Sequence, residues 1–107
     1  MEVKRICVLG AGLMGSGIAQ VAAEAGYEVV MRDIEDRFVQ NGFNIIRKNH
    51  ERAVSKGKMT QEQSQGILGR IKGMVDLGQA VQGSDVVIEA VVENMDLKRK
   101  VYEELDR

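Results

Sequence analysis

The 107-residue sequence has few of the residues that bind metals or form disulfides. Its one cysteine, Cys7, cannot form an internal disulfide, and its one histidine, His50, leaves no Cys/His cluster to hold a metal ion. A single cysteine inside an apolar run is typical of a reduced, cytoplasmic protein. We therefore expect no disulfide, no metal site and a cytoplasmic location.

An excess of one charge and a long apolar run are also missing. Lys and Arg together number 15 against 16 Asp and Glu, for a formal net charge of −1, whereas proteins dedicated to nucleic acids usually carry a large basic excess. No apolar run approaches the roughly 18 residues that cross a bilayer. The sequence thus predicts neither nucleic-acid nor membrane partners, and its length fits one domain, residues 1–107.

The first third of the sequence has the pattern of a strand, a helix and a second strand. Residues 3–9 are apolar and β-branched and stop at Gly10, and residues 28–33 form a similar run. Between them, from Leu13 to the stop at Gly26, apolar residues repeat at helical spacing. This order predicts a βαβ unit with parallel strands and a right-handed crossover.

The remaining sequence continues the alternation of helices and strands. An amphipathic helix over 35–54 and a second helix opened by the capping-box pattern at Thr60, carrying Ile67, Leu68 and Ile71, predict a helical hairpin. Strands follow at 72–75 and 86–91, the second apolar enough to be covered on both faces, with a short helix capped by Asp76 between them and a last helix from Asn94. We predict an α/β, Rossmann-type doubly wound parallel sheet of order 3-2-1-4, with the hairpin inserted between the second and third strands.

A glycine-rich turn joins the first strand to the first helix. Its residues fit the pattern G-x-G-x-x-G and are Gly10, Ala11, Gly12, Leu13, Met14 and Gly15. In such a turn the first glycine permits a tight bend, the second lets a pyrophosphate approach, and the third lets the helix pack closely on the strands. Free N–H groups and the positive dipole end of the helix then hold the phosphate oxygens. The turn therefore predicts a dinucleotide site.

Asp33 ends the second strand, 18 residues after Gly15, close to the spacing at which an acid binds the adenosine ribose. Its carboxylate would accept bonds from both ribose hydroxyls and repel a 2′-phosphate, so we expect NAD rather than NADP. Arg32 could hold such a phosphate, but strand alternation points it away from the side of Met31 and Asp33.

With these residues in view, the chain resembles the N-terminal domain of the 3-hydroxyacyl-CoA dehydrogenases, a family that includes 3-hydroxybutyryl-CoA dehydrogenases. The resemblance lies in residues 10–20 (GAGLMGSGIAQ), Asp33, residues 56–60 (KGKMT) and residues 85–98 (DVVIEAVVENMDLK), and extends over essentially the whole chain. It implies oxidation of an L-3-hydroxyacyl-CoA to the 3-ketoacyl-CoA with NAD, in fatty-acid metabolism such as β-oxidation.

The resemblance also implies contacts that the motifs alone do not give. Glu93 and Lys98 match positions near the nicotinamide half of the cofactor, and Asn49 and Lys56 match hairpin positions that contact coenzyme A. The hairpin has a local basic excess, which suits phosphates: Arg47, Lys48, Arg52, Lys56 and Lys58 against Glu51. The family commonly has serine where this chain has Asn49.

No catalytic residue is predicted in these 107 residues. His50 is expected to be an ordinary helix-face histidine with no acid to orient it except its neighbour Glu51. The resemblance implies that the catalytic histidine, its glutamate partner and a helical second domain lie further along, so we expect this chain alone to be inactive. Without the further strand that the resemblance implies, the strand at 86–91 forms an apolar edge of the sheet, which predicts self-association or a homodimer.

Two alternatives remain open from the sequence. The 3-hydroxyisobutyrate and 6-phosphogluconate dehydrogenases also favour a methionine before the third glycine, although they usually lack the hairpin and the basic Lys-Gly-Lys turn. A non-catalytic NAD-binding module of the same fold is the other alternative.

Overall fold

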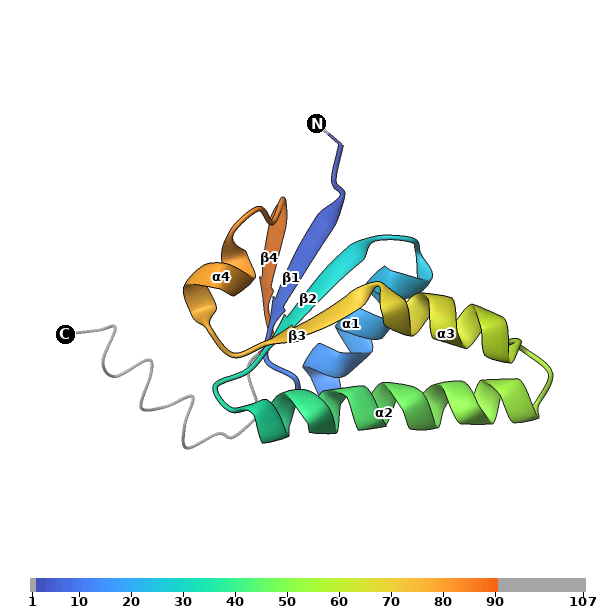
Figure 1. The fold of residues 1–107 in the computed structure, drawn as a ribbon. Helices are drawn as coiled ribbons and strands as arrows, with labels where there is room; N and C mark the ends of the chain where they lie inside the picture. Colours follow the sequence, from blue (N-terminus) through green and yellow to red (C-terminus); the bar gives the residue numbers. More distant parts are fainter. Residues whose placement is uncertain (1, 91–107) are drawn as a thin grey trace.

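In a computed structural model, residues 2–90 are described and form a parallel sheet of four strands in the order β3-β2-β1-β4 (Figure 1). The strands are β1 (Arg5–Leu9), β2 (Glu28–Arg32), β3 (Ile71–Met74) and β4 (Val86–Glu89). Cys7 lies opposite Val30 of β2 and Val87 of β4 in the register, so β1 is the central strand. The predicted strand order is confirmed.

Four helices complete the described part of the chain and lie on the two faces of the sheet (Figure 1). They are α1 (Leu13–Glu24), α2 (Asp36–Ser55), α3 (Gln61–Gly69) and α4 (Leu77–Val81). Helices α1, α2 and α3 pack together over one face, and α2 and α3 form the predicted hairpin, which extends past the edge of the sheet. No helix within residues 2–90 is long and apolar enough to cross a membrane.

The side chains of the strands alternate between two apolar clusters, as expected for a sheet covered on both faces. Ile6 and Val8 of β1 join the larger cluster under α1 and the hairpin. Cys7 faces the other way, into a smaller cluster with Val30 and Ala80 of α4. Cys7 is fully buried, and burial raises the pKa of its thiol, so it packs as a small apolar side chain.

Local signals set the ends of the helices. Thr60 forms both halves of a capping box with Gln63, and Asp76 accepts a hydrogen bond from the Gln79 N–H at the start of α4. The prediction for Ile71 was wrong, because this residue begins β3 and packs in the larger cluster instead of ending α3. The predicted helix from Asn94 lies outside the described residues.

The prediction that the last strand is covered on both faces was wrong for the described residues. Val86 and Ile88 are partly buried against the larger cluster, whereas Val87 is 45% exposed and Glu89 is exposed. Residues 2–90 include only the short α4 on that side of the sheet, and α4 lies over β2 and β3. The apolar run therefore predicted the strand correctly but not how it is covered.

Asp85, just before β4, ties that strand to the start of β1. Its Oδ2 accepts hydrogen bonds from the backbone N–H groups of Lys4 at 2.8 Å and Arg5 at 3.0 Å. These two bonds lower the pKa of the Asp85 carboxyl, since they favour its ionised form.

The lowered pKa predicts how stability depends on pH. A group whose pKa is lower in the folded state stabilises the fold above its unfolded pKa of about 3.9, and that contribution is lost as pH falls through the folded value. We expect Asp85→Asn to lower the melting temperature at pH 7, and the difference from wild type to shrink at pH values below 3. Glu51→Gln, at an exposed acid of α2, is the control. If the melting temperature of Asp85→Asn stays below that of wild type by the same amount from pH 7 to the lowest pH, this role is contradicted.

Candidate dinucleotide-binding site

The glycine loop follows the central strand, with β2 on one side and β4 on the other. Gly10 bends the chain at φ +116°, and its N–H donates to the Arg32 carbonyl at the end of β2 at 2.7 Å. On the other side, a Cβ on Gly10 would collide with the carbonyl oxygen of Ala90, which follows β4. The loop therefore crosses the carboxyl edge where the strand order reverses, the place at which such sheets bind ligands.

Gly15 lets α1 approach this loop closely. A Cβ on Gly15 would collide with the Gly10 carbonyl oxygen and lie 2.7 Å from its carbon and 3.3 Å from the Ala90 Cβ. Only a residue without a Cβ fits between the helix and the loop, which agrees with the packing role predicted for the third glycine.

The start of α1 has free hydrogen-bond donors. Gly12 precedes the helix without a side-chain cap, and no acidic residue lies in the first turn. The first intrahelical bond is donated by Ser16 N–H to the Gly12 carbonyl at 2.9 Å, so the N–H groups of Leu13 and Met14 have no helical acceptor. Leu13 is 79% exposed and Met14 50% exposed, so this turn is open to an anion.

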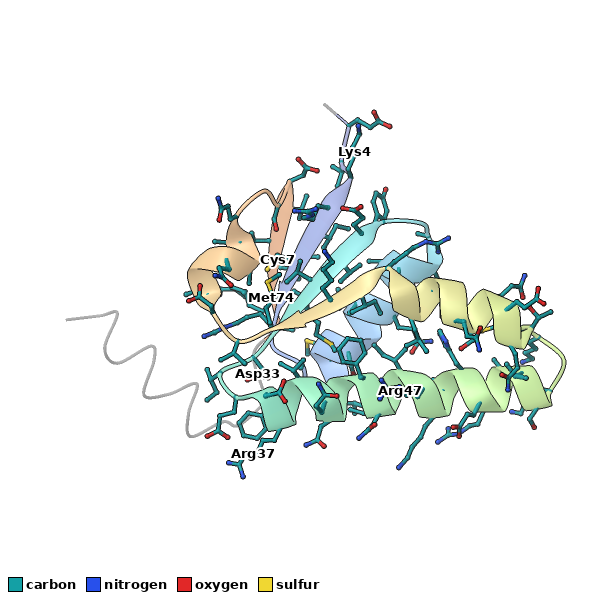
Figure 2. All side chains as sticks on the ribbon, in the orientation of Figure 1. Lys4, Cys7, Asp33, Arg37, Arg47 and Met74 are labelled. Carbon is teal, nitrogen blue, oxygen red and sulfur yellow. The ribbon has the colours of Figure 1, made fainter. Side chains whose placement is uncertain are left out.

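Asp33 faces the glycine loop from the end of β2 (Figure 2). Its Oδ2 accepts a hydrogen bond from the Ala11 N–H at 2.8 Å, and its Oδ1 accepts one from the Ile34 N–H at 2.7 Å. Each carboxylate oxygen has a second lone pair, so both can still accept from a pair of hydroxyl groups. The structure thus brings Asp33 and the loop together, as the spacing predicted.

Arg32 is held on the opposite side, as strand alternation predicted. Its Nε donates to the Val75 carbonyl after β3 at 2.8 Å, whereas the preceding Met31 is fully buried in the larger cluster. The Arg32 guanidinium is therefore held away from the Asp33 carboxylate. It does not offset the repulsion between that carboxylate and a 2′-phosphate.

The two hairpin positions lie along α2 and away from the glycine loop. Gly42 marks where α2 touches the loop, since a Cβ there would lie 2.8 Å from the Ala11 carbonyl oxygen. Asn49 is half-buried, two turns further along, and the exposed Lys56 follows after two more turns. At a rise of 1.5 Å per residue they lie about 10 and 21 Å beyond Gly42 along the axis. Glu93 and Lys98 lie outside the described residues.

The burial and the surroundings of His50 differ from the prediction. It is 2% exposed, and its Nδ1 lies 2.9 Å from the Ser64 Oγ of α3, while Nε2 lies 3.4 Å from the Glu24 Oε1 at the end of α1. An acid other than Glu51 therefore faces the ring. The sequence did contain a signal, because His50 follows the buried Ile46 by four residues and so extends the buried stripe of α2.

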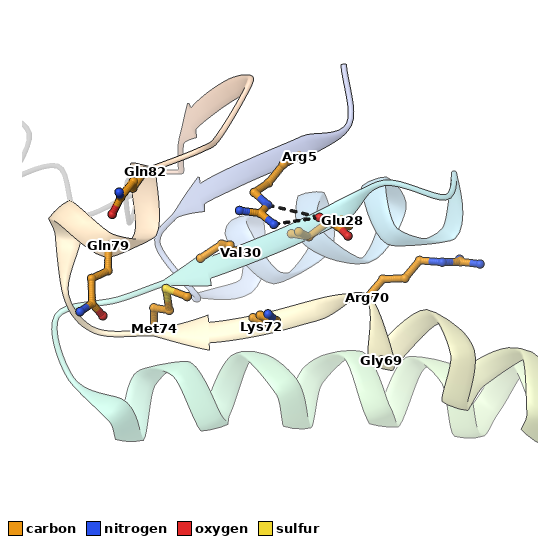
Figure 3. A pocket seen from close by; sticks show the side chains of 10 residues that line it. Arg5, Glu28, Val30, Gly69, Arg70, Lys72, Met74, Gln79 and Gln82 are labelled. Carbon is orange, nitrogen blue, oxygen red and sulfur yellow. Dashed lines mark hydrogen bonds and ion pairs between the residues drawn. The ribbon is translucent and has the colours of Figure 1, made fainter. Parts of the chain in front are cut away.

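A separate pocket of about 200 Å³ lies on the sheet face that α4 partly covers (Figure 3). Arg5 and Glu28 line it as an ion pair at 3.1 Å, with Val30, Lys72 and Met74 on its floor. None of the glycine-loop residues and no part of Asp33 lines this pocket. We assign it no role in dinucleotide binding.

The loop, the open turn and Asp33 together fit a dinucleotide. The positions where a Cβ would collide, the free N–H donors of α1 and the carboxylate at the end of the neighbouring strand match the parts that bind pyrophosphate and ribose in this fold. Among residues 2–90, no group of three or more His, Cys, Asp or Glu side chains gathers where a metal could bind.

Comparison with known proteins identifies relatives of the same kind. The family model "3-hydroxyacyl-CoA dehydrogenase, NAD binding domain" matches residues 5–107. A probable 3-hydroxybutyryl-CoA dehydrogenase of Bacillus subtilis is 42% identical over 107 residues, covering all of this chain and 37% of that protein. A glyoxysomal fatty acid beta-oxidation multifunctional protein of Cucumis sativus is 36% identical over 106 residues, covering 99% of this chain and 14% of that protein.

Solved structures that resemble this chain come from dehydrogenases of the same family. The (S)-3-hydroxybutyryl-CoA dehydrogenase of Ralstonia eutropha superposes with a TM-score of 0.84 at 39% identity, covering 98% of this chain and 37% of that one. FadB2 of Mycobacterium tuberculosis gives a TM-score of 0.84 at 42% identity, over all of this chain and 37% of that one. This chain therefore spans little more than a third of such relatives, and it belongs to the family of NAD-binding domains of 3-hydroxyacyl-CoA dehydrogenases.

Proposed function

We propose that this chain is the cofactor-binding part of an enzyme that oxidises an L-3-hydroxyacyl-CoA to the 3-ketoacyl-CoA, with NAD accepting the hydride. The observation that carries the proposal is the 2.8 Å bond from the Ala11 N–H to Asp33 Oδ2, because it holds a ribose-binding carboxylate against a phosphate-binding loop. The family match supports the same cofactor.

Within this proposal the glycine loop and Asp33 contact different parts of the cofactor. The open N–H groups of the first turn of α1 hold the pyrophosphate, and Asp33 accepts from the two hydroxyls of the adenosine ribose. Gly10 and Gly15 keep the backbone close enough for both contacts. Glu93 and Lys98, outside the described residues, are proposed contacts on the nicotinamide side.

The one histidine of the chain is not placed to act as the general base. Removing the hydroxyl proton of the substrate needs a base within hydrogen-bond reach. His50 does not serve, since it is 2% exposed and its ring lies between Ser64 and Glu24. We therefore propose no catalytic role for His50.

The hairpin is the proposed binding surface for the acyl-CoA. Its exposed basic side chains face solvent on α2 and the turn after it, where they raise the local concentration of a polyanion. Asn49 and Lys56 are seven residues apart and so lie on the same side of the helix.

Charge reversal at Lys56 tests this surface. Lys56→Glu should weaken coenzyme A binding about tenfold, because it exchanges a phosphate-binding cation for an anion, while NAD affinity stays within about twofold of wild type. Lys72→Glu, an exposed change on β3 outside the hairpin, is the matched control. Amide chemical shifts recorded during titration with each ligand measure both affinities. Equal loss for the two ligands, or no loss for coenzyme A, would contradict the assignment.

Self-association and location complete the proposal. We propose that the exposed side of β4, including Val87 at 45% exposure, contributes to self-association or a homodimer, which light scattering over a concentration series measures. A monodisperse monomer at high concentration would contradict it.

A cytoplasmic location is proposed from the single buried cysteine, although the Cucumis sativus relative is named as glyoxysomal.

A further inference from the structure

The cavity on the sheet face of α4 combines a charged rim with an apolar floor (Figure 3). Side chains alternate along each strand, so Arg5 shares this face with Cys7 on β1, and Glu28 shares it with Val30 on β2. In the register Arg5 lies opposite Glu28, and Cys7 lies opposite Val30. The first row of side chains at the amino ends of these strands is therefore charged, and the next row is apolar.

Helix α4 is too short to cover this face. It has five residues and is about 7.5 Å long, whereas β2 has five residues and is about 16 Å long. Ala80 of α4 packs on Cys7 and Val30 and is fully buried, and its neighbour Gln79 already lines the cavity. The cavity is thus the part of the face that α4 leaves open.

The floor of the cavity suits a hydrocarbon group. Val30 is 5% exposed, and the half-buried Met74 packs against the same small apolar cluster. A ligand that covers these two side chains removes apolar surface from water on both sides of the contact. The volume of about 200 Å³ is smaller than the pockets that take drug-sized ligands, so it favours a ligand of few carbon atoms.

Arg5 can bind an anion in addition to Glu28. Its Nε and Nη2 both donate to the same oxygen, Glu28 Oε2, at 3.3 and 3.1 Å. Since a guanidinium has five N–H donors and two are used here, three have no acceptor among the described residues. Both side chains of the pair are exposed, at 40% and 66%, so the pair contributes little stability and can rearrange.

Lys72 gives the cavity a positive balance of charge. It lies opposite Val30 in the register and is exposed, and residues 2–90 give it no ion-pair partner. Arg70 contributes less, because its Nη1 donates to the Ala23 carbonyl at 2.8 Å and its side chain points away from Lys72 (Figure 3). Two cations therefore face the cavity against the single carboxylate of Glu28.

We propose that this cavity binds a small aliphatic carboxylate, whose charged end pairs with Arg5 and whose hydrocarbon part lies on Val30 and Met74. Lys72 adds attraction for the anion, and Glu28 competes with the ligand for the Arg5 guanidinium. No residue of the glycine loop lines the cavity, so this site is separate from the dinucleotide site. The inference does not depend on the proposed function.

Butyrate and its neutral amide test the site in the wild-type chain. Sodium butyrate should shift the backbone amide signals of the strand residues around the cavity, with a Kd of about 1 mM, against a sodium chloride reference at equal ionic strength. Butyramide has nearly the same size without the charge and should bind about tenfold more weakly. Equal affinities, or butyrate shifts confined to the glycine loop, would overturn the inference.

The two members of the ion pair should have opposite effects on butyrate. Arg5→Gln should weaken its binding about tenfold, whereas Glu28→Gln should tighten it about threefold, because the competing acceptor is gone. Arg5→Lys should restore only part of the loss, since an ammonium lacks the planar fork of donors. Both Gln variants break the same ion pair, so a merely structural role of that pair predicts changes in one direction, and such a result would contradict the site.

Two further measurements complete this test. Arg47→Gln, which removes an exposed cation from α2, is the matched control and should leave the butyrate affinity within about twofold of wild type. Propionate should bind about three- to fourfold more weakly than butyrate, because it has one fewer methylene group on the apolar floor. An affinity independent of chain length would show that Val30 and Met74 are not in contact with the ligand, and the inference would be wrong. If Arg5→Gln does not fold, Glu28→Gln and the comparison with butyramide still decide the outcome.

Discussion

Replacing Gly15 with alanine is expected to lower the free energy of unfolding by about 3 kcal/mol and to abolish NAD binding. The new methyl group would collide with the Gly10 carbonyl oxygen and lie 3.3 Å from the Ala90 Cβ, so α1 must move away from the loop residues that follow β1 and β4. For a domain of this size, such a loss lowers the melting temperature by about 12 °C or more. Thermal unfolding and NAD titration of the purified variant measure the two effects.

Gly17→Ala is the matched control for Gly15→Ala. It makes the same substitution half a turn further along α1, where an added Cβ meets nothing within 4 Å. Alanine is the better helix former there and should stabilise the fold by about 0.5–1 kcal/mol. If the two variants have the same stability, the close approach of α1 to the loop is not the reason that position 15 needs a glycine.

Changing Asp33 is expected to have the largest effect on NAD affinity while the fold remains. Asp33→Asn keeps the size of the side chain, but it removes the carboxylate that we propose accepts hydrogen bonds from the ribose hydroxyls and places an NH₂ group in its position. The loss of charge-assisted hydrogen bonds costs about 2–3 kcal/mol, which corresponds to a roughly 30- to 150-fold higher Kd for NAD. The NADP affinity should fall less or rise, because the repulsion of the 2′-phosphate is gone.

Asp36→Asn provides the control, since it removes the same charge from an exposed position in the first turn of α2. It should leave NAD affinity within about twofold of wild type. Asp33 also bonds the Ala11 N–H, so the melting temperature of Asp33→Asn must be measured alongside. An unchanged NAD affinity in Asp33→Asn would contradict the ribose contact.

The sequence predicted those parts of the fold that local residue chemistry determines. The β-branched run before Gly10, the helical period after Leu13 and the acid at position 33 each have a short-range cause, and together they predicted the βαβ unit and its strand order. The capping pattern at Thr60 likewise placed the start of α3 at its observed position. The pairing of Asp33 with the loop followed from its spacing of 18 residues after Gly15 in the dinucleotide-binding pattern.

The features that sequence reasoning missed depend on contacts between distant segments. The spacing from Ile46 indicated that His50 is buried, but not what surrounds its ring: Glu24 and Ser64 lie 26 positions before it and 14 after it, and no local pattern joins them to it. The same is true of the hydrogen bond that Asn49 donates to Gln20. The exposure of Val87 was missed because an apolar run shows that a strand has apolar side chains, but not what packs on each face.

A thermal-shift titration of this chain with NAD and NADP in parallel tests the central claim most directly. At 100 times its Kd, a ligand that binds only the folded state adds about 2.7 kcal/mol, which raises the melting temperature of a small domain by roughly 10 °C or more. The glycine loop and Asp33 predict this rise with NAD and a much smaller one with NADP at the same concentration. An equal or larger shift with NADP, or no shift with either nucleotide, would contradict the account.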